Sequence, residues 1–252
     1  MTKYSNSKLD TFDQCKLKYK YRYIDKIPVE IETTIEAFMG SMVHDTLEFL
    51  YKQLQENKLP TLKDLLEFHN KKWEENYSTN ILIVKNNPSD FYKDKGSKFI
   101  INYYYKHYPF NQSRTLALET QAFLPLDSSR NYHIRIDRLS IGSDKTIEVN
   151  DYKTNNRLKT QNEVDKDRQL AMYSLWVKNK FPNSKIKLVW HFLAFNQHLE
   201  STRTHEELEK LKLEVLTKIK EIESAQDFPA NQTPLCNYCE FQEICPEFKK
   251  TI

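Results

Sequence analysis

Three side chains near the middle of the chain have the types and spacing of a metal-dependent hydrolase. Asp137 lies within one run of alternating apolar and polar residues, and Asp151 and Lys153 end the next run. Both runs predict β-strands. If the two strands form a hairpin, Asp137 and Asp151 converge at one end of the sheet. Because Asp151 and Lys153 are two residues apart, both side chains point to the same face.

Two carboxylates and an ammonium around a small space suit the hydrolysis of a phosphodiester. Carboxylates hold a divalent ion such as Mg²⁺ or Mn²⁺. The ion polarises a phosphate oxygen and lowers the pKa of a bound water, and a lysine can offset the charge that develops on the phosphate. An Asp-x-Lys pair also occurs by chance, commonly as a surface ion pair. The neighbouring motifs therefore decide its meaning.

The hydrophobic pattern predicts the elements that must position these residues. In chain order they are helices over 7–24, 34–56, 61–76 and 90–108, strands over 115–125, 131–141 and 145–153, a helix over 162–180, a strand over 185–195 and a helix from 205 to about 225. Thr204 and Glu207 have the form of a capping box at the start of the last helix. This order predicts an α/β fold with a mixed central sheet flanked by helices.

We expect a single domain over 1–252, with a helical N-terminal part (1–110), a core (111–225) and a cysteine-rich C-terminal segment (226–252). The 252 residues are 39% hydrophobic, enough for a buried core. Three glycines are too few for a Rossmann site or a P-loop. We expect no membrane span and no signal peptide, because no long apolar run occurs, and therefore a cytoplasmic protein.

A basic stretch lies near the N-terminus. The segment from Lys16 to Lys26 carries five cations against one anion, and tyrosines alternate with the cations. Such a mixture suits the backbone and bases of a nucleic acid. A solvated helix face is the plainer explanation, and the stretch by itself favours that.

Four motifs make the chain resemble the PD-(D/E)XK nuclease superfamily, and more narrowly its RecB/AddB-type exonuclease branch. Gly40–His44 resembles the helical Gly-x-x-x-His element. Ile136–Arg138 resembles the Ile-Asp-Arg strand, although Arg135 and its neighbours replace the usual preceding glycine. Asp151–Thr154 matches the Asp-Tyr-Lys-Thr signature, and Gln169–Tyr173 matches the Gln-x-x-x-Tyr helix. The resemblance implies a restriction-endonuclease-like core.

The resemblance also implies roles for individual residues. It implies catalytic roles for Asp137, Asp151, Lys153 and Gln169, and metal ligation by His44, Asp137, Asp151 and Tyr152. Gln169 and Tyr173 share a helix face, which in the family approaches the active site and the nucleic acid. A half-buried structural histidine is the alternative for His44. Glu119, on the preceding strand, is equally well a supporting group of the site or an exposed strand residue. Glu148 is expected to face away.

The four cysteines suggest a second centre. Cys236, Cys239 and Cys245 lie within ten residues of one another, and Cys15 lies far upstream. Four thiolates can hold either zinc or an iron–sulfur cluster. The resemblance implies a 4Fe–4S cluster, because iron–sulfur members of the branch, including the CRISPR-associated exonucleases of the fourth Cas family, have one cysteine before the core and a C-x-x-C-x₅-C group after it.

The position of the basic stretch directly after Cys15 then makes it a candidate for contact with nucleic acid. We expect this contact from Lys18, Tyr19 and Arg22, together with Tyr173.

The expected function is that of a metal-dependent DNA exonuclease acting on single-stranded ends, in CRISPR adaptation or DNA repair. The chain has no Walker motif, so a separate integrase or helicase is the expected partner. The alternatives are a nuclease subunit of a helicase–nuclease recombination complex and a catalytically silent nucleic-acid-binding iron–sulfur module. A redox protein that uses the cluster alone would leave the carboxylate–lysine group unexplained.

Overall fold

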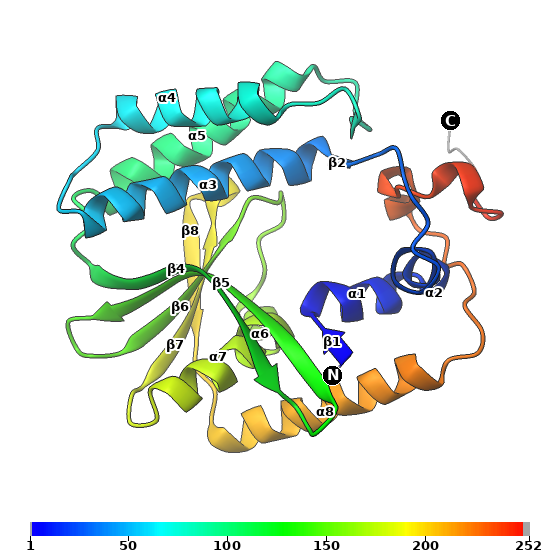
Figure 1. The fold of residues 1–252 in the computed structure, drawn as a ribbon. Coiled ribbons are helices and arrows are strands. Elements are labelled where there is room, and N and C mark those ends of the chain that lie inside the picture. Colours follow the sequence, from blue (N-terminus) through cyan, green and yellow to red (C-terminus); the bar gives the residue numbers. More distant parts are fainter. Residues whose placement is uncertain (1, 249–252) are drawn as a thin grey trace.

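A mixed β-sheet with helices on both sides forms the frame of the protein, which we describe from a computed structural model (Figure 1). The structure describes residues 2–248, so the predicted outer bounds, 1 and 252, lie outside the described residues. The strand order is β1-β5-β6-β7-β8, and β4 also pairs with β5. The strands are β1 (Thr2–Tyr4), β4 (Ser113–Pro125), β5 (Arg130–Gly142), β6 (Ile147–Lys153), β7 (Ile186–Phe192) and β8 (Gln197–Ser201).

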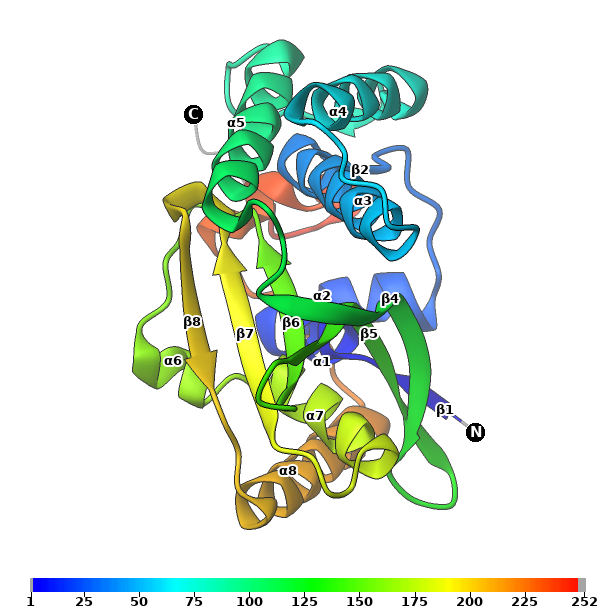
Figure 2. The same cartoon turned by 90° about the vertical axis from the view of Figure 1, so that its left-hand side faces the viewer.

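The pairing confirms the predicted mixed sheet. The pairs β1–β5 and β6–β7 are parallel, whereas β4–β5, β5–β6 and β7–β8 are antiparallel. Strands β4 and β5 are the longest, and together they extend beyond β6 as an arm, whose far end also pairs with β1 (Figure 2).

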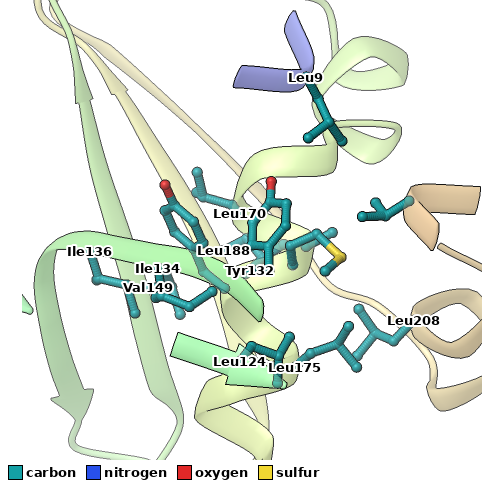
Figure 3. Close-up of a cluster of buried hydrophobic side chains, with 14 of the residues drawn as sticks. Leu9, Leu124, Tyr132, Ile134, Ile136, Val149, Leu170, Leu175, Leu188 and Leu208 are labelled. Carbon is teal, nitrogen blue, oxygen red and sulfur yellow. The ribbon is translucent and has the colours of Figure 1, made fainter. Parts of the chain in front are cut away.

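Two hydrophobic clusters hold helices against this sheet. The first joins the sheet to α1 (Asn6–Gln14), α7 (Arg168–Lys180) and α8 (His205–Ser224), and part of it is drawn in Figure 3. Tyr132 and Trp190 are its largest fully buried side chains. The second lies among α3 (Ile35–Gln55), α4 (Leu62–Asn76) and α5 (Ser89–His107), the helical layer above the sheet in Figure 1.

The helices begin where side chains satisfy their first backbone N–H groups. Thr204 and Glu207 form the predicted capping box at α8, and Thr61 with Asp64 forms another at α4. Ser5 caps α1 through its hydroxyl, which accepts from the backbone N–H of Lys8.

Two predicted helices are interrupted. The helix expected over 7–24 breaks at Cys15, whose backbone is extended, into α1, α2 (Lys16–Tyr19) and a π-helical turn (Lys20–Ile24). The helix expected over 162–180 divides into α6 (Gln161–Asp165) and α7, because Asp167 leaves the helical conformation and caps α7. In both places a side chain accepts a hydrogen bond from a free backbone N–H group at the start of the new helix. Hydrophobic spacing does not reveal such a cap.

Several short elements have no counterpart among the predicted ones. Strand β8 is a polar edge strand of five residues that follows a left-handed residue, Asn196. Its sequence lacks the apolar alternation on which strand prediction depends. The remaining short elements are β2 (Thr33–Thr34), β3 (Ile81–Leu82) and the 3₁₀ turns Leu193–Phe195, Pro234–Tyr238 and Gln242–Ile244.

Among the described residues, no helix has both the length and the apolar character needed to cross a membrane.

Candidate active site

The candidate site lies where β5, β6, α3 and α7 meet. The antiparallel register pairs Arg138 with Asn150, so Asp137 and Asp151 are neighbours across the hairpin, as the sequence predicts. Lys153 follows on the same face of β6 as Asp151. The site therefore depends on strand register, which a buried sheet face specifies strongly.

Gly40 allows α3 to approach the end of β6. A Cβ atom placed at Gly40 would lie 2.8 Å from Oγ1 of Thr154, closer than van der Waals contact permits. The missing side chain thus lets the helix approach the signature segment, and His44, one turn later, reaches the site. This explains in physical terms why glycine and histidine stand four residues apart.

His44 connects the helix to both strands. Its Nε2 donates to the backbone carbonyl oxygen of Tyr152 at 2.8 Å, and its Nδ1 lies 3.5 Å from Oδ2 of Asp137. The same carboxylate oxygen accepts from the backbone N–H of Tyr152 at 2.8 Å. Burial disfavours the charged imidazole, but Asp137, Asp151 and the Tyr152 carbonyl outweigh it and raise the pKa of His44 to about 9.

Glu119 belongs to this group, although its sequence context left it open. Ligand atoms of His44, Glu119 and Asp137 all lie within 4.8 Å of one another. Glu119 also has a left-handed backbone, with φ of 42°, inside a strand. Such a conformation costs roughly 1–2 kcal/mol for a residue with a side chain, and backbone outliers of this kind cluster at functional sites. No sequence pattern identifies a single left-handed residue within a strand.

Asp151 and Lys153 form the second half of the site. Nζ of Lys153 donates to Oδ1 of Asp151 at 3.0 Å and to Oε1 of Gln169 at 3.1 Å. Gln169 in turn donates from Nε2 to the hydroxyl of Tyr173 at 3.2 Å. The helix motif residues Gln169 and Tyr173 thus hold the lysine from the α7 side.

One carboxylate oxygen of this half has no hydrogen bond. Oδ2 of Asp151 is buried and has no hydrogen-bond partner among the described residues. The Lys153 ammonium lies 2.8 Å from this atom but outside hydrogen-bonding geometry, so the contact is one of charge alone. A buried acceptor without a donor is costly. The charge of the Lys153 ammonium offsets this cost, and the oxygen still has lone pairs that a metal ion could use.

The two aspartates differ in their electrostatics. Burial opposes the ionisation of Asp137, but His44, the Tyr152 N–H and Lys153 more than compensate, so its pKa is lowered. Burial dominates at Asp151 and raises its pKa despite Lys153. Burial likewise raises the pKa of Glu119, and the charge of Asp137 adds to this effect. Burial thus disfavours the ionised forms of Asp151 and Glu119, and a bound cation would stabilise them.

Tyr152 contributes through its backbone, while its side chain faces the helical layer. Its hydroxyl accepts from Nε of the buried Arg138 at 3.2 Å. Arg138 also lies over the ring of Tyr51, 4.2 Å from its centroid, and donates to Oδ1 of Asn150 at 3.2 Å. Arg138 has no predicted role, yet its hydrogen bond helps to hold Tyr152, the residue that contacts both His44 and Asp137.

Glu148 stands outside the site, as expected from its position on β6. Its carboxylate accepts from Ser140 at 2.9 Å and pairs with Lys187 at 3.1 Å.

The basic stretch contacts other parts of the protein. Tyr19 is only 4% exposed and packs edge-on against Phe12. Lys18 pairs with Glu240 at 3.0 Å, and Arg22 pairs with the same carboxylate. Tyr173 is also buried and presents its hydroxyl to Gln169. The rings of Tyr19 and Tyr173 are thus buried, and contact of Lys18, Tyr19, Arg22 and Tyr173 with nucleic acid stays a prediction.

All four cysteines line one cavity of about 130 Å³ between α1–α2 and the C-terminal segment. All four are free thiols. The break at Cys15 turns its Sγ toward the start of α2, where it accepts from the backbone N–H of Lys18. Burial raises the pKa of the Cys239 thiol.

Protein contacts also hold the two chain segments together around this cavity. The Leu17 N–H donates to the Pro229 carbonyl at 3.2 Å, and Asn231 Nδ2 donates to the Gln14 carbonyl at 2.9 Å. Segments more than 200 residues apart in the sequence therefore lie side by side (Figure 1).

Comparison with known proteins places this geometry in context. Comparison with curated proteins found no match. Among solved structures, the chain is similar to the crystal structure of SSO0001, with 15% identity and a TM-score of 0.43, over 99% of this chain and 88% of that chain; this likeness is too weak to support a statement about function. The sequence profile of the PD-(D/E)XK nuclease superfamily matches residues 3–246. Because that match spans nearly the whole chain, the protein belongs to the PD-(D/E)XK nuclease superfamily.

Proposed function

We propose that the protein is a divalent-metal-dependent DNA exonuclease of the RecB/AddB-type branch that acts on single-stranded ends. The observation that carries this proposal is the meeting of His44, Glu119 and Asp137 within 4.8 Å, beside the Asp151–Lys153 pair. Membership of the nuclease superfamily implies a nucleic acid as substrate and a divalent metal in catalysis.

The donor set fits a hard divalent cation. The donor atoms are one imidazole nitrogen and three carboxylates, which suits Mn²⁺ or Mg²⁺. They come from His44, Glu119 and Asp137, together with Asp151, whose Oδ2 accepts no hydrogen bond. The backbone carbonyl of Tyr152, 2.8 Å from His44, lies beside this set and is the fifth candidate. When bound, the ion supplies Lewis acidity and a water of lowered pKa.

The remaining site residues act on the phosphate and on one another. Burial opposes the charged form of Lys153, but the negative charge of Asp151 and the hydrogen bond to it outweigh burial and raise the pKa of the lysine. Its ammonium is placed to offset charge on the scissile phosphate. Gln169 accepts a hydrogen bond from the Lys153 ammonium at 3.1 Å and so orients the lysine. The Tyr173 hydroxyl accepts a hydrogen bond from Gln169 and so orients the amide.

A metal-titrated cleavage assay tests this function. End-labelled single-stranded and duplex DNA would be incubated with the protein in Mg²⁺, in Mn²⁺ and in chelator. We expect shortening of single-stranded DNA from one end that stops with chelator. Uniform internal cuts would contradict the exonuclease mode. Absence of cleavage under every metal condition, with retained binding, would favour the catalytically silent nucleic-acid-binding module.

We further propose that Cys15, Cys236, Cys239 and Cys245 hold a 4Fe–4S cluster. The shared cavity supports a common centre for all four thiols. The resemblance to iron–sulfur members of the branch favours the cluster over a single zinc ion, which four thiolates can also hold.

In this proposal the cluster joins the N-terminal helices to the segment that begins at residue 226, so that the chain forms one domain. Protein purified without oxygen should be brown, with broad visible absorbance that dithionite bleaches. A colourless protein with one zinc ion would contradict the cluster. The pathway, CRISPR adaptation or DNA repair, with an integrase or helicase as partner, is proposed from the same branch resemblance, and co-purification from the native cell tests it.

A further inference from the structure

The arm of β4 and β5, which pairs with β1 at its far end, extends beyond the rest of the sheet (Figure 2). Side chains along the arm alternate between two faces. Leu124 and Ile134 point into the core, whereas Phe123 is 44% exposed and the Arg135 side chain is 59% exposed. Phe123 thus leaves part of its aromatic ring in solvent beside exposed polar residues.

This face is continuous with the site. Strand register pairs Gln121 with Arg135 and Phe123 with His133, and the same face continues to Glu119 and Asp137, two residues further along each strand. Each step of two residues advances about 6.7 Å, a distance comparable to the length of one extended nucleotide. A strand of nucleic acid that runs along this face would therefore reach the carboxylates.

The side chains on this face have the chemistry of a single-strand binding surface. Lys3 Nζ lies 4.8 Å from the centroid of the Phe123 ring, and the His133 ring lies 5.3 Å from it. Arg135 adds a second cation, 3.1 Å from Glu119 through its Nε. An exposed ring flanked by cations combines base stacking with attraction of phosphates.

We propose that this arm surface, defined by Lys3, Gln121, Phe123, His133 and Arg135, binds the single strand that enters the active site, with one base stacked on Phe123. The inference deepens the proposed function and rests on it. Stacking on Phe123 tolerates every base, because each base has an aromatic face. A duplex hides its base faces from the ring, so the surface selects single strands.

The direct test is binding without cleavage. An Asp151→Asn protein would be titrated into fluorescent oligothymidylate, and into a blunt duplex of the same length, by anisotropy. Adding Phe123→Ala should weaken single-strand binding by about 5- to 150-fold, the range for loss of one stacked base, and leave duplex binding unchanged. Phe123→Trp should restore binding.

Matched variants separate stacking from general effects. Tyr105→Ala removes a ring that is 70% exposed on α5, away from the arm, and should bind as its parent does. Lys3→Ala should reduce the salt dependence of binding by about one phosphate contact. Phe123→Ala binding equal to its parent, or equal losses for single strand and duplex, would overturn the proposal.

Cleavage by the parent protein distinguishes the two proposals. If wild-type protein cleaves single strands and Phe123→Ala cleaves them with unchanged KM, the arm surface fails while the proposed function stands. If no substrate is cleaved but single-strand binding still depends on Phe123, the proposed function fails and the arm surface stands.

Discussion

The carboxylate–lysine site and the cysteine cavity are organised in opposite ways. The first is built inside the fold, where strand register and the missing side chain of Gly40 bring buried charges together. The second lies between the N-terminal helices and the C-terminal segment, which few backbone hydrogen bonds and the Glu240 ion pairs hold together. We expect substitutions in the first region to change the rate of cleavage. Substitutions in the second should change how firmly the N-terminal helices and the C-terminal segment are held together.

The largest effect is expected from a substitution that changes only the carboxylate–lysine site. Asp151→Asn removes the anionic oxygen that has no hydrogen-bond partner and should lower kcat by about 100- to 1000-fold, as for loss of one preorganised electrostatic group. Thermal melting should change little, because the isosteric amide also relieves repulsion with Asp137. Steady-state cleavage of labelled DNA measures the loss.

A control on the same strand completes this test. Glu148→Gln changes an acid whose partners are Ser140 and Lys187, and it should cleave within about twofold of the parent, as most surface substitutions leave function intact. Equal losses in the two variants would show that general charge, and not the position of Asp151, is responsible.

The next effect tests whether α3 must approach β6 closely. Gly40→Ala brings a Cβ within 2.8 Å of Thr154 Oγ1 and should displace His44. We expect kcat to fall by about 10- to 100-fold, since misplacement on the order of 1 Å costs that much. Thr154→Ala removes the clashing atom, so the double variant should recover much of the loss. Additive losses would contradict the steric explanation.

A smaller effect on cleavage, but a larger one on assembly, is expected at the cysteines. Cys15→Ser should abolish the visible absorbance and lower Tm, by about 2–4 °C for each kcal/mol lost in a domain of this size. We expect kcat on single-stranded DNA to remain within about threefold, because catalytic geometry depends on the sheet. A loss of kcat as large as that of Asp151→Asn would show that the two regions are coupled.

The smallest effect is expected outside both regions, where acid should lower the stability of the fold through His107. His107 lies against Tyr103 and His191, and burial, with Lys106 and Arg138 nearby, lowers its pKa to about 4. The unfolded chain binds this proton near pH 6.5, so stability contributed by neutral His107 is complete above that pH and is lost as pH falls toward 4.

The measurement is chemical denaturation of wild-type and His107→Gln proteins at several pH values between these limits. The variant should show a weaker dependence on pH in this window. Identical pH dependences would exclude His107 as the source.

Local sequence was sufficient to predict which residues share a face when they lie on the same strand or helix. Asp151 and Lys153 share a face because two residues on one strand must do so, and Gln169 and Tyr173 share a face because they are four apart on a helix. The helices around Val43 and Val215 follow from the spacing of their apolar residues, and the capping box at Thr204 marks where the last of them begins.

Features that depend on distant partners could not be read in the same way. Glu119 joins His44 only because of strand register and a left-handed backbone. Tyr19 alternates with cations in the sequence, and only the packed structure shows that it is buried against Phe12. The exposed ring of Phe123 is one apolar residue among several in an alternating strand, and no pattern shows that its face is left uncovered.

The sequence by itself determined the chemical types, the α/β order of elements and the membership of a nuclease superfamily, because these depend on local periodicity and short motifs. The tertiary structure decided which groups meet. It brought Glu119 to His44 and Asp137, left one oxygen of Asp151 without a hydrogen bond, and gathered four cysteines from both ends of the chain around one cavity. The physical reason is that register, burial and close approach are properties of packed pairs, and a single segment does not contain its partner.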